Sequence, residues 1–435
     1  MNKKPNHELS EMACPHQLAD VDLFAQGAQE HWYEAYDILH NEAPVHRIPG
    51  EGFMPGTDAF ILTRYEDISR VVKDEQRYPP ALSLMIRQLS ESPEAAVNMN
   101  TMIQSMVSLR PNPELWRTHR QELTDPWVGP GASRHKSMIV DVAHSLIDQW
   151  VDEEKVDFVS QFAQPLPQMV MAKVLGWPIE DLKLLKHFGD GTVKAFVYGS
   201  GHRCILPTEE VRSQLEVLQE FQAYTNALIA ARRSAPEEDM ITFLTTVEYS
   251  PLNRKLTDAE INGIVYAMVI GGLETTQYAL AEQVQLVIEK HAVWQALKAD
   301  KRKVRAFTEE GMRLRAPTQG LSTRTTSQEE VFQGVAVPKG SFLHMRWAAA
   351  NIDPLEWDDP TELKLDRKAG TRHLTFSQGA RVCPGASLSR LEQVEAWNAL
   401  IDRIDHFEYA QDNTFTHQPG IMLGITKLNL AFKKQ

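Results

Sequence analysis

The stretch Phe376-Ser-Gln-Gly-Ala-Arg-Val-Cys-Pro-Gly385 carries the strongest chemical signal in this chain. It places Cys383 between glycines, and a helical pattern over residues 386–404 follows at once. A cysteine just before a helix N-terminus meets backbone N–H groups and the positive end of the helix dipole, which favours the thiolate. A thiolate can ligate haem iron, and Phe376 would shield the sulfur from water. The alternative is a buried structural cysteine in a glycine-rich turn.

Composition indicates a globular protein and limits its partners. The 435 residues are 43% apolar and 24% charged, which excludes disordered and fibrous classes. The net charge of −13 argues against nucleic acid as the main partner, because phosphate binding needs clustered positive charge. We find no internal repeat and no linker, so we expect one continuous domain over residues 1–435.

We expect no targeting signal in the N-terminal residues. The segment MNKKPNHELSEMACPHQ has lysines but no apolar core behind them, and we expect residues 1–20 to be flexible. The longest nearly unbroken apolar run, 263–273, is too short to span a bilayer, which takes about 20 residues. We therefore expect a soluble cytoplasmic protein without a membrane partner. Cys14, Cys204 and Cys383 are too few and too far apart for a disulfide framework or a zinc site.

The pattern of apolar residues predicts a mainly α protein with small β-sheets. Residues 133–291 have the three- and four-residue spacing of helices. The last of these helices begins at Thr257 with the spacing of a capping box and continues to about His291. Short strand patterns lie near the two ends of the chain, at residues 58–65, 329–345 and 425–434.

The pattern F-x-x-G-x-R-x-C-x-G resembles the haem-binding loop of the cytochrome P450 family. Glu310 and Arg313 are similar to the family's E-x-x-R pair, two charges on one helical face whose implied role is to hold the irregular loop before the cysteine. The resemblance implies the cytochrome P450 fold, a single large domain with a long central helix. It also implies haem b (heme b, iron protoporphyrin IX) as cofactor and Cys383 as its iron ligand.

The middle of the predicted long helix resembles the oxygen-activation segment of the family. Gly271 and Gly272 lie in a helix interior, where each glycine costs about 1 kcal/mol relative to alanine. The resemblance implies that these glycines let the cofactor and dioxygen approach the backbone. Thr275 would then hydrogen-bond bound oxygen, and Glu274 would relay protons. The alternative is a glycine kink packed against a neighbouring helix.

Several residues match positions that contact the haem in this family. Trp116 and Arg120 resemble the W-x-x-x-R element, and Arg324 and Arg381 match two further arginines, all implied to hold the haem propionates. Arginine suits this role because its planar fork pairs with a carboxylate through two hydrogen bonds. Taken singly, each arginine is typical of a solvated surface. Phe376 and Gly385 would contact the cofactor from the cysteine loop.

One departure from the pattern concerns the cysteine loop itself. Pro384 stands where many bacterial members of the family carry an aliphatic residue, and proline has no N–H to donate to the sulfur. Losing that hydrogen bond should make the thiolate a stronger donor and the reduction potential more negative.

The pair Glu274 and Thr275 implies reductive activation of O2 with electrons from another protein. No flavin or iron–sulfur domain is recognisable, so a separate ferredoxin with its ferredoxin reductase is implied, or a flavodoxin. A basic docking face is expected on the cysteine side, and the protein is expected to be a monomer. The residues of this face are Arg117, Arg120, Lys368, Arg372, Arg381 and Arg390.

The segments that line the substrate pocket in this family are apolar and rich in methionine here. Such a lining suits a terpene, a fatty acid or a steroid-like molecule, although methionine at helical spacing is also typical of ordinary core. The alternative within the same chemistry is oxidative O-demethylation of a methyl ether. A haem-binding sensor or carrier is the alternative of another class, and Glu274 speaks against it. The candidate pocket residues are Met102, Met106, Tyr266, Val269, Ile270, Gln319, Leu321, Met422 and Leu423.

Overall fold

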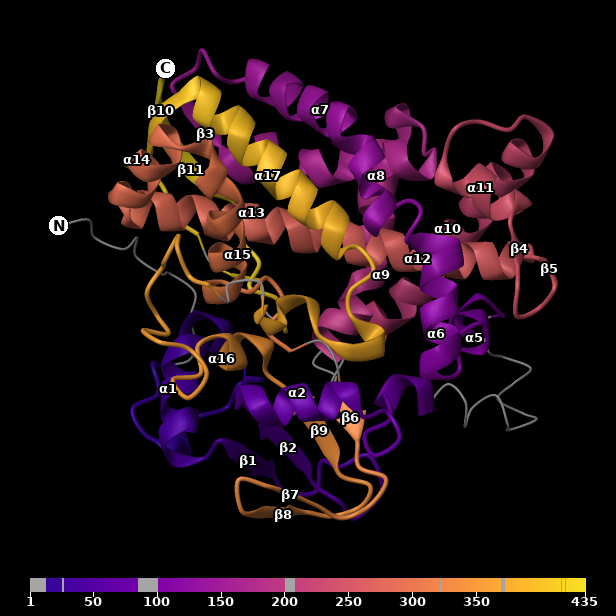
Figure 1. Ribbon diagram of the computed structural model, residues 1–435, viewed down its shortest axis with the longest axis vertical. Coiled ribbons are helices and arrows are strands. Elements are labelled where there is room, and N and C mark those ends of the chain that lie inside the picture. The colour runs from indigo at the N-terminus through magenta and orange to yellow at the C-terminus, as the bar shows by residue number, and fades with distance from the viewer. Residues whose placement is uncertain are drawn as a thin grey trace.

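The computed structural model places most helices in one part of the molecule and most strands in another (Figure 1). It describes residues 13–25, 27–84, 101–199, 208–320, 323–368, 372–415, 417–418 and 420–435. Cys204, Leu321 and residues 1–12 of the expected flexible segment lie outside these ranges. Within the described residues, no helix is both long and apolar enough to cross a membrane.

Two small sheets carry most of the strands. The larger has the order β1-β2-β9-β6, in which β2 runs parallel to β9 and the other neighbours are antiparallel. The smaller has the order β10-β11-β3, and β4–β5 and β7–β8 are two-stranded. The three predicted strand regions are confirmed by β2, by β7 to β9, and by β11. The strands are β1 Val45–Ile48, β2 Ala59–Leu62, β3 Lys155–Asp157, β4 Glu248–Tyr249, β5 Arg254–Lys255, β6 Thr323–Thr325, β7 Glu330–Phe332, β8 Val335–Val337, β9 Phe342–Met345, β10 Ile404–Tyr409 and β11 Asn429–Lys434.

Helices form the larger part and bury most of the apolar side chains between them. The last long helix, α17, starts directly after the cysteine loop and packs against α7, α13 and α15. The helices are α1 Trp32–Glu42, α2 Tyr65–Lys73, α5 Thr101–Ser108, α6 Pro113–His119, α7 Lys136–Asp148, α8 Pro165–Leu175, α9 Leu182–Gly199, α10 Thr208–Ser234, α11 Met240–Thr246, α12 Asp258–Gly272, α13 Glu274–Glu289, α14 His291–Ala299, α15 Val304–Leu314, α16 Trp347–Asn351 and α17 Ala386–Arg403.

The predicted long helix is present as two helices that follow one another across the molecule (Figure 1). The capping box at its start is confirmed, since the Thr257 hydroxyl accepts from the Glu260 N–H and the Glu260 carboxylate accepts from the Thr257 N–H. Helical geometry is interrupted at Leu273, whose ψ of −64° separates α12 from α13. The break follows directly after Gly271 and Gly272, two consecutive residues of weak helix propensity.

Candidate functional site

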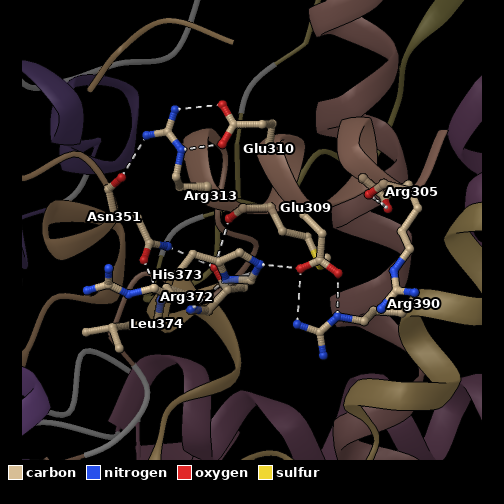
Figure 2. Close-up of polar contacts among 12 residues, drawn as sticks. Arg305, Glu309, Glu310, Arg313, Asn351, Arg372, His373, Leu374 and Arg390 are labelled. Carbon is tan, nitrogen blue, oxygen red and sulfur yellow. Dashed lines mark hydrogen bonds and ion pairs between the residues drawn. The ribbon is translucent and has the colours of Figure 1, made fainter. Parts of the chain in front are cut away.

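The E-x-x-R pair is a buried ion pair that holds an irregular segment. Glu310 and Arg313 on α15 are at most 1% exposed, and two hydrogen bonds of 2.8 and 3.0 Å join them (Figure 2). Arg313 also donates to the carbonyl oxygens of Asn351, Pro360 and Glu362 at 2.6–3.0 Å. The pair therefore satisfies backbone groups that a loop without regular structure leaves unpaired. Arg367 adds a third charge at 2.9 Å from Glu310, and the motif alone did not indicate it.

A second charged cluster lies next to this pair and was not predicted. Glu309 accepts two hydrogen bonds from Arg390 on α17, at 2.6 and 3.1 Å, and lies 3.0 Å from the His373 ring (Figure 2). Burial raises the pKa of the Glu309 carboxyl, but the hydrogen bonds from His373 and Arg390 outweigh it and bring the pKa to about 2. The Arg390 guanidinium also lies 4.4 Å from the centre of the Phe376 ring. The cluster thus joins α15 and α17 on either side of the cysteine loop.

The cysteine loop closes on itself before α17. The N–H of Cys383 donates to the carbonyl oxygen of Phe376 at 2.9 Å. Gly379 has a φ of +76°, and a Cβ there would come within 2.9 Å of the carbonyl oxygen of Val72, so the turn requires glycine. These contacts present the half-buried Cys383 at the start of α17, as the sequence predicts.

The ionisation of this cysteine depends on opposing effects. Burial raises the pKa of the Cys383 thiol, whereas the N–H groups of Gly385 and Ala386 and the charges of Arg120 and Arg390 lower it, and burial outweighs them. The helix-end donors therefore favour the thiolate, as the sequence predicts, but they do not overcome burial alone. A coordinated metal ion at the sulfur would add a further positive charge.

One face of the α12–α13 run is open. Ala267, Ile270, Gly271, Glu274 and Thr275 follow one another at helical spacing and keep contact with solvent, whereas their sequence neighbours are mostly buried. A Cβ at Gly271 or at Gly385 would meet nothing within 4 Å, so both glycines border free space. Gly272 differs, because a Cβ there would collide with the methyl group of Met171 on α8. The packing alternative therefore describes Gly272, and Gly271 faces an opening.

The acid and the alcohol of the predicted oxygen-activation pair lie on this open face. The Thr275 hydroxyl donates to the Gly271 carbonyl oxygen at 2.8 Å, which leaves its oxygen free to accept. Burial and the negative charge of Asp190 raise the pKa of Glu274 to about 7, against smaller opposing effects of Lys186 and Tyr278. Glu274 can therefore hold or release a proton near neutral pH.

The predicted propionate residues gather with one that the sequence did not indicate. Arg381 and Arg110 place their guanidinium carbons 4.2 and 3.9 Å from the centre of the Trp116 ring. Burial, together with the charge of Arg381, lowers the pKa of Arg110 to about 9 and that of Arg324 to about 10. In the described part of the chain, Arg110 has no carboxylate within ion-pair distance, and Glu75 pairs only with Arg381, at 2.8 Å.

This cluster is incomplete as a set of protein groups. Nε of Arg120, Nε of Arg324 and Nε1 of Trp116 are buried, and none has an acceptor among the described residues. Buried donors without acceptors and neighbouring like charges both destabilise the folded protein. An anion that accepts several hydrogen bonds would relieve both effects. The two carboxylates of haem b have that chemistry, and Cys383 offers the axial thiolate. The residues present therefore fit the predicted cofactor.

The candidate pocket residues differ in how far they are buried. Ile270 on the open face and Met106 on α5 are partly exposed, whereas Met422 is buried against Tyr278. Val269, Met102 and Tyr266 lie in the helical core, and Leu423 packs in the core around Trp32. Gln319 is fully buried, where it accepts from the Tyr36 hydroxyl and donates to the Ala316 carbonyl oxygen, so its polar groups are already used.

Known proteins resemble this chain over nearly its whole length. The family model described as Cytochrome P450 matches residues 51–432. The polyketide biosynthesis cytochrome P450 PksS of Bacillus subtilis is 25% identical over 95% of this chain and 99% of its own. The biotin biosynthesis cytochrome P450 of the same species is 26% identical over 87% and 90%. P450BioI, in a crystal structure with acyl carrier protein ligated to hexadec-9Z-enoic acid, superposes with a TM-score of 0.78 over 93% of this chain and 99% of its own, at 23% identity. Because the family model covers most of the residues that form the fold and the site, the chain belongs to the cytochrome P450 family.

Proposed function

We propose that this protein inserts one oxygen atom from O2 into a C–H bond of a largely apolar small molecule, with electrons from a separate ferredoxin. Cytochrome P450s are monooxygenases that bind haem b through a cysteine thiolate. The observation that carries the proposal is the open face of α12 and α13, which presents Glu274 and Thr275 beside Gly271.

In this proposal the residues around the cysteine loop hold the cofactor. Cys383 would ligate the iron, and Trp116, Arg120 and Arg324 would donate to the propionates with Arg110 and Arg381. Haem b, when bound, supplies the redox chemistry that activates dioxygen. Gly271 and Gly385 would border the ring plane, since neither has a neighbour that a side chain would meet.

Glu274 and Thr275 would manage protons at the oxygen site. A carboxyl with a pKa of about 7 is protonated in an appreciable fraction of molecules at neutral pH and can be reprotonated after each transfer. The Thr275 hydroxyl, which donates to Gly271, offers its oxygen as an acceptor toward the open space. A haem sensor or carrier needs no such acid, which favours the enzyme.

The substrate class is proposed from the apolar side chains near this face. Ala267 and Ile270 on α12, with Met422 from the C-terminal loop, offer aliphatic and thioether surface. Terpenes, fatty acids and steroid-like molecules suit such a lining. Oxidative O-demethylation of a methyl ether is the second candidate, because it begins with the same hydroxylation.

The redox partner would dock where the cysteine loop reaches the surface. Four of the six expected cations are neutralised by carboxylates: Arg120 by Asp125, Arg372 by Glu356, Arg381 by Glu75 and Arg390 by Glu309. Arg117 is exposed and has no carboxylate partner among the described residues. It borders a hollow of about 400 Å³ with Arg120 and Gly379. The basic patch that remains is therefore smaller than the basic face predicted from the sequence. Its positive charge would suit an acidic ferredoxin.

A spectral titration of the ferric protein tests the proposal. Terpenes, fatty acids, steroids and aryl methyl ethers are added in turn while the Soret band is recorded. A shift to shorter wavelength with an apolar compound, followed by detection of its hydroxylated product, is the expected result. A response to methyl ethers alone would favour demethylation, and a purified protein without a Soret band would contradict the cofactor and the function together.

A further inference from the structure

Tyr278 lies between the proposed proton-transfer acid and the C-terminal loop. It follows Glu274 by one helical turn on α13, which brings the two side chains to the same face, and donation from Tyr278 is one of the effects that lower the pKa of the Glu274 carboxyl. The same hydroxyl donates to Oε1 of Gln418 at 3.0 Å. Tyr278 therefore links α13 to a residue 140 positions later in the chain.

The loop around Gln418 holds the tyrosine in place. The Gln418 N–H donates to the Gly424 carbonyl oxygen at 2.7 Å, which closes the loop. A Cβ at Gly424 would come within 2.7 Å of Cζ of Tyr278, so the loop backbone packs directly on the ring. Ile421 and Met422 cover the ring as well, and only 1% of Tyr278 is exposed. The ring cannot move away from Gln418 without moving the loop.

A phenol has one proton, which Tyr278 donates to Gln418 in this structure, and the Glu274 carboxylate on the same helical face is the second acceptor in reach of a small movement. When Tyr278 donates to Gln418, the Glu274 carboxylate loses a donor, and when it donates to Glu274, the Gln418 oxygen loses one. The other charged groups that face Glu274 come from α9: Asp190, which disfavours the carboxylate, and Lys186, which favours it. Lys186 and Asp190 pair with each other, so their effects on Glu274 partly cancel. The hydroxyl of Tyr278 is then the donor to Glu274 whose partner can change.

We propose that Gln418 competes with Glu274 for the hydroxyl proton of Tyr278, which makes Tyr278 and Gln418 positioning residues for the proton-transfer acid. The proposal rests on the proposed role of Glu274. It also connects the acid to the substrate side of the molecule. The Ile421 carbonyl oxygen accepts from the Gln319 N–H, and Met422 bridges to Thr318, so a ligand that displaces Met422 moves the loop that carries Gln418.

The test measures the ionisation of Glu274 in the haem-loaded full chain without turnover. Infrared difference spectra are recorded across pH, and the Glu274 carboxyl band is identified by its loss in Glu274→Gln. Tyr278→Phe removes a donor to the carboxylate and should raise the pKa of Glu274. Gln418→Met keeps the side-chain volume but removes the competing acceptor, so it should lower that pKa. Each shift should be about half a pH unit to one pH unit.

The two variants should shift the pKa of Glu274 in opposite directions, whereas general damage to the site would not produce opposite shifts. In the double variant, Gln418→Met should cause no further shift, because it acts only through the Tyr278 hydroxyl. Gln149→Met, at the exposed residue that follows the end of α7, is the matched control and should leave the band unchanged. Shifts of the same sign, no shift, or a shift from Gln418→Met that persists without the hydroxyl would overturn the proposal. If Tyr278→Phe fails to fold, the sign of the Gln418→Met shift decides alone. The Glu274 band is recorded without substrate. An error in the proposed substrate class therefore does not affect this test of the Tyr278–Gln418 contact.

Discussion

Arg110 places its guanidinium carbon 3.9 Å from the centre of the Trp116 ring, and no described carboxylate neutralises it. Burial and the charge of Arg381 lower its pKa to about 9. The buried charge therefore destabilises the folded, cofactor-free protein. Cation–π contact with an indole offsets part of that cost. An anion bound at the same cluster would turn the arginine from a destabilising group into a stabilising one.

Replacing this arginine should therefore separate stability from cofactor retention. We expect Arg110→Met to raise the melting temperature of the cofactor-free protein and to speed haem loss about tenfold, because a hydrogen bond to a charged group contributes about 1.5–3 kcal/mol. Transfer of haem to apomyoglobin measures the rate. Arg134 lies 4.9 Å from the Trp127 ring and provides the control, since Arg134→Met removes a similar contact without an anion. Equal haem loss in wild type and Arg110→Met would contradict the assignment.

Arg117 should govern electron delivery and leave substrate binding intact. We expect Arg117→Glu to slow reduction by an acidic ferredoxin about tenfold at low ionic strength, and to lose part of that effect at high salt, because screening weakens exposed charges. Stopped-flow reduction and a Soret titration measure the two properties separately. Arg302 is an exposed arginine outside the six cations, and Arg302→Glu should have little effect. Weaker substrate binding with unchanged reduction would place Arg117 in a different role.

Glu274 should give product formation a defined pH dependence. A carboxyl with a pKa of about 7 donates protons only while protonated, so we expect the rate limited by this step to fall as pH rises through about 7. Glu274→Gln cannot donate a proton and should lower turnover about 100-fold and flatten this part of the pH profile. Turnover of an identified substrate across pH checks this, with haem content as the control. A variant that keeps the wild-type profile would exclude Glu274 as the acid.

The same group has a linked effect on stability. Its pKa is about 7 in the folded protein and 4.5 as the ordinary value, so the folded state retains a proton that the unfolded state loses between these values. The folded protein is therefore destabilised by this carboxyl as pH rises from about 4.5 to 7. Urea unfolding of Glu274→Gln should show less loss of stability over that window than the wild type.

The sequence predicted those parts of the site whose chemistry depends on local spacing. Cys383 before a helix and Glu310 beside Arg313 lie within a few residues of what defines them, and the structure places both as expected. Arg110, Glu309 and Arg367 were missed because their partners come from other elements, and nothing local marks them. Val269 and Gln319 were predicted to line the pocket as members of matched segments, and the structure shows both as fully buried. Which face of the segment points to the cavity depends on tertiary packing.

The long helix illustrates the same limit for the fold. Its start was predictable, because the capping box uses residues three positions apart. Its interruption at Leu273 was not, because glycines in a helix interior are compatible with either a continuous or a broken helix. The outcome depends on contacts such as that between Gly272 and Met171 on α8, which only the folded chain brings together.

Pro384 should lower the reduction potential of the bound haem. The N–H groups of Gly385 and Ala386 lower the pKa of the Cys383 thiol, and proline at position 384 has no N–H to add to them. Hydrogen bonds from N–H groups withdraw charge from a thiolate, so Pro384→Ile should make the potential less negative by about 40 mV, the equivalent of about 1 kcal/mol for one electron. Spectroelectrochemical titration measures the potential, and Ala380→Ile in the same loop tests whether added bulk alone changes it. An unchanged or more negative potential in Pro384→Ile would show that the missing donor has no influence on the iron ligand.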